Sequence, residues 1–178
     1  MDSLCTYFLD LIQNSIAAKS ETITLSMVES DRLHVSIIDD GCGMTDDELN
    51  RALSPFYSSR TTRRVGLGLS MMKMLLEQTN GSMKLTSKKH QGTTLIMSFD
   101  QSHIDLPDLG DIGELIYFIS IHQDVKDFIF IYQTNEKIYR YHLKEIKEIL
   151  GDALQTFSVM KALIQSINEE INTIRGIT

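Results

Sequence analysis

Apolar and polar residues alternate in several short stretches between residues 22 and 99. This spacing is typical of strands with one buried face. It predicts four strands, over residues 22–28, 33–38, 83–87 and 93–99. Apolar residues that instead recur every three or four positions predict helices, over residues 3–19, 45–54 and 71–79. The first hundred residues therefore combine strands and helices, and we expect them to form one domain, residues 1–100.

The remainder, residues 101–178, has its own pattern of a helix, two strands and two further helices. We expect these elements at residues 111–120, 126–133, 137–143, 144–150 and 156–174. The last helix carries a narrow apolar seam at alternating steps of three and four residues, formed by Phe157, Met160, Ile164, Ile167, Ile171 and Ile174. The seam could pack on its own domain, or it could form a homodimer or partner contact. We predict a helix-hairpin-helix extension.

A glycine-containing turn, residues 39–44, follows the second predicted strand. The strand ends at Asp39, and Gly41, Gly43 and Met44 come next. Glycine has no Cβ, so its backbone can lie close to a ligand. A carboxylate at the strand end can accept a hydrogen bond from the exocyclic amine of a base. The alternative interpretation is a tight turn between a strand and a helix.

Asp10 and Asn14 lie one helical turn apart beside the apolar face of the first helix, so both could act on one ligand. The alternative is a polar helix edge. Further along, the loop at 56–65 contains Arg60, Arg63 and Arg64, which favour an anion, although a solvated loop would have the same composition. The glycines of the next segment open a helix and bring its free N–H groups towards an anion. That segment is Gly66, Leu67, Gly68 and Leu69.

These motifs, with Gly92 and Thr93, occur in the order and spacing of the GHKL superfamily, which the chain resembles over residues 3–100. That superfamily includes DNA gyrase, heat-shock chaperone ATPases, mismatch-repair ATPases and the catalytic domain of histidine kinases. The resemblance implies an α+β two-layer sandwich with the Bergerat-type ATP-binding fold. It implies that Asn14 ligates magnesium, that Asp39 binds the adenine amine and that Thr93 completes the adenine site. The second glycine motif would cradle the phosphates.

The whole chain, including residues 55–63 and 102–105, resembles a narrower group of small stand-alone bacterial proteins, the histidine-kinase-like ATP-binding proteins. It departs from the wider pattern in three ways. The gyrase-like ATPases have glutamate where Asp10 stands. The chain begins inside the first motif, so we expect no preceding helix with a phosphorylatable histidine. The loop at 56–65 is short, so we expect no large ATP lid.

The composition of the chain excludes some classes of binding partner and cellular location. The net charge of −7 argues against nucleic acid, which requires a basic surface. No apolar run is long enough to cross a membrane, and no signal peptide is evident at Met1. Cys5 and Cys42 lack metal-ligand spacing and are typical of reduced thiols, so we expect a cytoplasmic protein.

We therefore predict a protein that binds ATP and Mg²⁺, with two hypotheses for its action. In the first it is a slow ATPase, or a protein kinase-like regulator acting on an unknown partner protein, with Asp10 as the catalytic base. In the second it is a nucleotide-dependent binding switch without significant catalysis. Asp10 keeps the carboxylate but is one methylene shorter than glutamate, which would slow turnover without abolishing binding.

Overall fold

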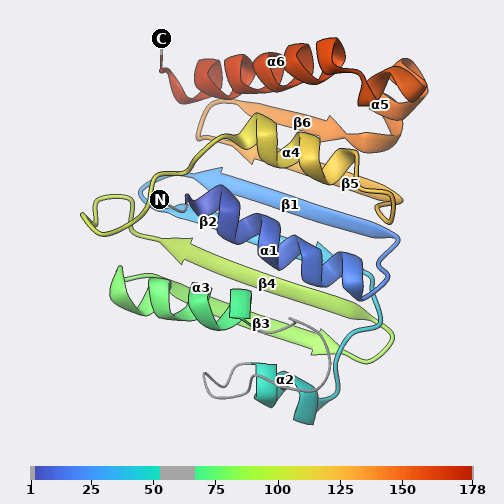
Figure 1. Cartoon of the computed structure of the whole chain (residues 1–178). Coiled ribbons are helices and arrows are strands. Elements are labelled where there is room, and N and C mark those ends of the chain that lie inside the picture. Colours follow the sequence, from blue (N-terminus) through green and yellow to red (C-terminus); the bar gives the residue numbers. More distant parts are fainter. Residues whose placement is uncertain (1–2, 53–66, 178) are drawn as a thin grey trace.

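The computed structural model describes residues 3–52 and 67–177, whose six strands form one sheet in the order β3-β4-β2-β1-β5-β6 (Figure 1). Only β1 and β5 are parallel, and the other neighbouring pairs are antiparallel. The strands are β1 (Thr22–Glu29), β2 (Leu33–Asp39), β3 (Ser82–Lys88), β4 (Gly92–Phe99), β5 (Asp127–Gln133) and β6 (Ile138–His142).

The described helices lie mainly on one face of this sheet, as Figure 1 shows for α1, α3 and α4. They are α1 (Leu4–Ala17), α2 (Asp46–Ala52), α3 (Leu67–Gln78), α4 (Ile112–Ser120), α5 (Leu143–Leu150) and α6 (Phe157–Arg175), with a short 3₁₀ helix, η1 (Gly151–Gln155). Alternate strand residues face these helices and form the core, as Ile23, Leu25 and Met27 do in β1. The two-layer arrangement of a mixed sheet and helices that the sequence predicts is confirmed.

Two predicted helix starts carry the hydrogen bonds that their sequences imply. At α2, the backbone N–H of Thr45 donates to Glu48 at 2.8 Å, and the N–H of Glu48 donates to Thr45 Oγ1 at 3.3 Å. At α4, the N–H of Glu114 donates to Asp111 Oδ1 at 2.8 Å. A third start differs from the prediction, because α3 is helical from Leu67 and its first turn already contains Gly68.

The helix-hairpin-helix extension is not confirmed as a separate unit. The hairpin β5–β6 belongs to the main sheet, since β5 pairs with β1 along its whole length, from Thr22 beside Asp127 to Val28 beside Gln133. The apolar seam of α6 is partly buried inside the same chain. Ile167 and Ile171 are almost fully buried where α6 packs on α4, whereas Phe157 at the helix start is 74% exposed.

An ion pair ties the end of α6 to the end of β1. The guanidinium of Arg175 donates to both carboxylate oxygens of Glu29, at 3.0 and 3.2 Å. Tyr132 and Gln101 also donate to this carboxylate. Burial raises the pKa of Glu29, but these hydrogen bonds and the charge of Arg175 outweigh it and hold the pKa below its usual value. Such a bidentate pair fixes the two elements in one relative position.

A second ion-pair cluster lies at the end of the β5–β6 hairpin. His142 Nε2 is 3.1 Å from Asp127 Oδ2, and its Nδ1 is 3.2 Å from Glu145. Hydrogen bonding to Asp127, helped by Glu145, raises the pKa of His142. Burial raises the pKa of Asp127, but hydrogen bonds from His142 and Lys144 outweigh it and leave the pKa lowered. The folded state therefore favours the charged pair.

We expect this pair to make folding stability depend on pH. The His142 contribution is fully present below the ordinary imidazole pKa of about 6.5 and is lost as pH rises through the raised pKa. Because the imidazole is about one-third exposed, the loss should stay under about 1 kcal/mol. Urea denaturation at pH 6 and pH 9, with His142→Gln as the control, measures it. If both proteins lose the same stability between these pH values, His142 has no such role.

Among residues 3–52 and 67–177, no helix is long and apolar enough to span a membrane. The two cysteines are free thiols, with Cys5 buried and Cys42 exposed. Burial raises the pKa of Cys5 to about 12, so this thiol stays protonated at neutral pH.

Candidate functional site

A cavity of about 330 Å³ lies between α1 and the core face of the sheet. It falls in the size range of small-molecule sites, about 300–1,000 Å³. Most of its lining is aliphatic, from α1, β2, β4 and the first turn of α3. The predicted site residues along its wall are Asn14, Asp39, Gly43, Met44, Leu69 and Thr93.

Asp39 is the buried acid of this cavity. As the last residue of β2, it is only 8% exposed, and it stands beside Thr93 across the β2–β4 ladder. Ser15 Oγ donates to Asp39 Oδ2 at 2.7 Å, and the N–H of Gly41 donates to Oδ1 at 3.0 Å. A carboxylate can accept about four hydrogen bonds, so Asp39 is held in place by two donors and can accept another from a ligand.

The turn after β2 packs directly on the β3–β4 turn. Gly43 has φ +58°, and a Cβ there would lie 2.0 Å from the carbonyl oxygen of Lys88. Gly92 has φ +88°, and a Cβ there would lie 1.9 Å from the carbonyl oxygen of Asp39. Both positions therefore require glycine, for its backbone conformation and for space.

The hydroxyl of Ser87 joins these two turns beside two residues that line the cavity, Met44 and Thr93. Ser87 Oγ accepts from the N–H of Met44 at 2.9 Å and lies 2.9 Å from the hydroxyl of Thr93. It also donates to the carbonyl of Gly92. The glycine turn is thus anchored to β3 and β4, and Met44 and Thr93 are kept on one side of the cavity.

Asp10 and Gly68 lie together where α1 meets the start of α3. A Cβ built on Gly68 would be 3.3 Å from Asp10 Cβ, so the two helices approach closely because position 68 is glycine. Asp10 is exposed and does not contribute to the lining of the cavity. Asn14, one turn further along α1, does.

The structure brings most of the predicted site residues together but leaves some outside the described part. Arg60, Arg63, Arg64 and Gly66 lie outside the described residues, as does the loop at 56–65. Leu67 begins α3. No group of three or more His, Cys, Asp or Glu that could hold a metal occurs among residues 3–52 and 67–177.

Sequence reasoning missed two polar residues of the site, Ser15 and Ser87. Ser15 is a buried hydroxyl within the α1 sequence next to Asn14, and a polar residue at such a position indicates a partner. Ser87 lies on the inward-facing side of β3, as Met83 and Leu85 do. Neither signal says which group the hydroxyl contacts.

Comparisons with known proteins find a family model that matches more than half of the chain. Residues 2–103 match the family model described as histidine kinase-, DNA gyrase B-, and HSP90-like ATPase. Sporulation kinase E of Bacillus subtilis is 30% identical over 104 residues, which are 56% of this chain and 13% of that protein. The sensor histidine kinase ZraS of Salmonella typhi is 32% identical over 95 residues, 51% of this chain and 20% of that protein. The chain thus spans a fifth or less of these curated relatives.

One solved structure is similar over most of the chain. The N-terminal domain of a DNA repair protein aligns over 86% of this chain and 58% of its own, with a TM-score of 0.50 and 12% identity. At this identity the likeness concerns the fold alone. Because it covers far more than residues 2–103, elements of the C-terminal part are included in it.

Proposed function

Because the chain belongs to the family of histidine kinase-, DNA gyrase B- and HSP90-like ATPases, we propose that it binds Mg-ATP in the cavity beside Asp39 and hydrolyses it slowly, or transfers its γ-phosphoryl group to a partner protein. ATP binding follows from the family. The observation that supports the location of the site and its chemistry is the buried, pre-positioned carboxylate of Asp39 in the same cavity as the amide of Asn14.

The adenine end of the proposed site is formed by β2 and β4. Asp39 accepts from the exocyclic amine, and the Thr93 hydroxyl lies beside it on the neighbouring strand. Aliphatic residues such as Leu11 and Leu95 line the cavity with apolar side chains. The fit is supported by the size of the cavity and by glycines 43 and 92, which let two backbone turns close around it.

The proposed metal ligand is Asn14, whose amide oxygen is the hard donor that Mg²⁺ prefers. In such sites Mg²⁺ keeps several waters and shares the substrate phosphates, so one protein ligand is enough. We expect Asn14→Ala to abolish the gain in ATP affinity on adding Mg²⁺ while leaving metal-free binding unchanged. Titration of both proteins with ATP, in Mg²⁺ and in EDTA, measures this. A variant in which Mg²⁺ still tightens binding as in the parent would show that Asn14 is not the ligand.

Asp10 is the proposed general base. When bound, Mg-ATP supplies the activated γ-phosphoryl group, and Asp10 removes a proton from the attacking water. Its place one turn before Asn14 and against Gly68 at the start of α3 supports this role. A well-placed base contributes about 10² to 10⁴ in rate. Asp10 is exposed and does not line the cavity, so we expect its contribution to the rate to lie at the lower end of that range.

Steady-state phosphate release tests this role directly. We expect Asp10→Asn to slow hydrolysis by about 10²-fold, with ATP affinity nearly unchanged, and Asp10→Glu to speed it. Glu77→Gln on α3 is a control for removing a carboxylate outside the proposed site. If Asp10→Asn releases phosphate at the parent rate, Asp10 is no base.

The second candidate is a nucleotide-dependent switch in which turnover is incidental. The observation that favours it is the exposed position of Asp10 outside the cavity wall. In this hypothesis the γ-phosphate orders the arginines of the loop at 56–65, and a partner responds to the bound nucleotide. A parent protein that binds ATP, with no phosphate release above that of the Asp10→Asn protein, would favour the switch over the enzyme.

A further inference from the structure

The sheet face that points away from α1, α3 and α4 has an ordered pattern of side chains. Cross-strand pairing joins them into rows that run over all six strands. The central row consists of Lys84, Ile96, Ser36, Ser26, Ile131 and Arg140. We call this row and its two neighbouring rows, which begin at Ser82 and Thr86 of β3, the outer face. It has a cation at each edge and isoleucine and serine between them.

The outer face is open. Its three rows contain no carboxylate, and Asp127, which lies in the next row on β5, is buried and paired with His142 and Lys144. Ile38 and Ile96 are 44% and 47% exposed, so within residues 3–52 and 67–177 no element covers them. The chain carries 24 acidic residues and a net charge of −7. No aspartate or glutamate lies in any of the three rows. A solvated face of an acidic protein would be expected to mix both signs of charge.

The pattern specifies the chemistry of a partner. Adjacent strands lie about 4.8 Å apart, so Lys84 on β3 and Arg140 on β6 are separated by about 24 Å across the sheet. We propose that the outer face docks a protein whose contact surface is uncharged and partly apolar at its centre and acidic at two places that match these cations. Complementary charges at a rim steer association and fix register, while the central isoleucines supply apolar area to bury.

Two other occupants fit the face less well. Nucleic acid would require a dense basic field or aromatic platforms, and the three rows contain no aromatic ring other than those of His34 and His142. A second copy stacked face to face would bring the cationic edges against cationic edges, because both edges have the same sign. Neither argument applies to a protein with acidic groups, which needs no dense basic field and is attracted to the cationic edges.

Docking on this face does not compete with the cavity. Side chains alternate along β2, so Ile38 points to the outer face while Asp39 points into the cavity. The inference rests on the sheet and is independent of whether Asp10 is a base. A complex should therefore form with the parent protein whether or not ATP is present.

Site-specific photocrosslinking in the cells that make the protein tests the inference. A benzoylphenylalanine at Ile96 should give one discrete adduct with another protein. The same residue at Met74, which is 52% exposed on α3, should not give it. The captured protein, once purified, should bind the full chain with an affinity that falls as salt increases. Lys84→Glu combined with Arg140→Glu should weaken binding by about tenfold or more.

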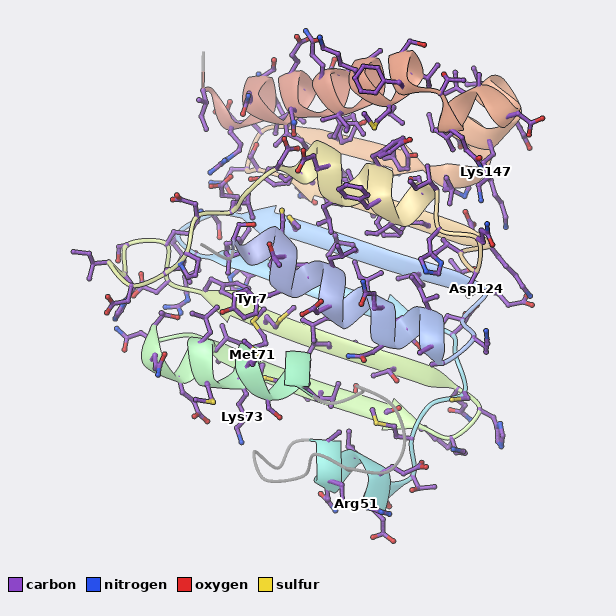
Figure 2. All side chains as sticks on the ribbon, in the orientation of Figure 1. Tyr7, Arg51, Met71, Lys73, Asp124 and Lys147 are labelled. Carbon is purple, nitrogen blue, oxygen red and sulfur yellow. The ribbon has the colours of Figure 1, made fainter. Side chains whose placement is uncertain are left out.

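A matched control carries the same change of charge on the helix layer. Lys73→Glu combined with Lys161→Glu alters α3 and α6, and Figure 2 labels Lys73 on the helix side of the molecule. This control should leave binding unchanged. Ile38→Thr, which keeps a β-branched residue in the strand, should also weaken binding without loss of stability in urea denaturation.

Four results would overturn the proposal. These are no adduct at Ile96, an adduct with a second copy, an adduct with nucleic acid, or an affinity for the captured protein that Lys84→Glu combined with Arg140→Glu leaves unchanged. An ATP titration of the reversed variant should match the parent. Failure of the docking face is thereby distinguished from failure of the nucleotide site.

Discussion

Asparagine in place of Asp39 is expected to weaken ATP binding by about 10- to 100-fold while the fold stays intact. All the groups that approach this side chain are donors: the Ser15 hydroxyl, the Gly41 N–H and the proposed adenine amine. An amide has one acceptor oxygen and turns an NH₂ towards one of these donors. Losing a hydrogen bond to a charged group costs about 1.5–3 kcal/mol, and each 1.4 kcal/mol is a factor of ten.

Calorimetric titration with ATP and GTP checks this prediction. The parent should prefer ATP, because guanine presents a carbonyl where adenine has its amine, and the variant should lose the preference. Asp46→Asn, a neutralised acid on exposed α2, is the control and should bind as the parent does. Equal affinities of the parent for ATP and GTP would refute the assignment of Asp39 to the adenine amine.

Alanine in place of Ile167 should lower the free energy of unfolding by about 2–5 kcal/mol. The side chain is 1% exposed where α6 packs on α4, so its removal leaves a cavity between two helices. Phe157→Ala on the same helix is the matched control, since the ring is 74% exposed. It should change stability by less than about 0.5 kcal/mol. Urea denaturation of the three proteins measures both values.

Truncation after Gly151 extends the same experiment to the whole of α6. It removes Ile167 and Ile171 together with the Arg175–Glu29 ion pair, so the product should be markedly less stable or insoluble. The alternative interpretation of the seam, a homodimer contact, stays a prediction, and sedimentation of the full chain tests it. A truncated chain as stable as the parent would mean that burial of the seam contributes nothing to the fold.

Much of the candidate site could be predicted because its motifs are local and keep their order along the chain. The acid at the end of β2, the asparagine on α1 and the threonine of β4 all line one cavity in the structure. The hydrogen bond from Ser15 to Asp39 could not be predicted, because it joins residues 24 positions apart and depends on the rotation of α1 over the sheet. The helix predicted over 71–79 begins later than α3, because glycine is a poor helix former in general, yet Gly68 lets α3 approach Asp10.

The C-terminal part shows more clearly what the periodicity of apolar residues cannot predict. Alternation identified both strands of the β5–β6 hairpin, but it gives no information about neighbours in a sheet. The parallel pairing of β5 with β1 depends on which strand edge is left open when β1, β2, β3 and β4 have paired. That edge is a property of the assembled domain, so the sequence predicts the hairpin only as part of a C-terminal extension that packs on the first domain or contacts a partner.

The parallel pairing of β1 and β5 also has a consequence for synthesis of the chain. Thr22 emerges from the ribosome about a hundred residues before its partner Asp127. At typical translation rates, this is roughly 5–20 s in which β1, paired with β2 along one edge, has no partner strand along the other. Such edges recruit other strands and promote aggregation. Contacts between distant parts of a chain also form slowly, so nascent chains should need chaperone protection until β5 is released.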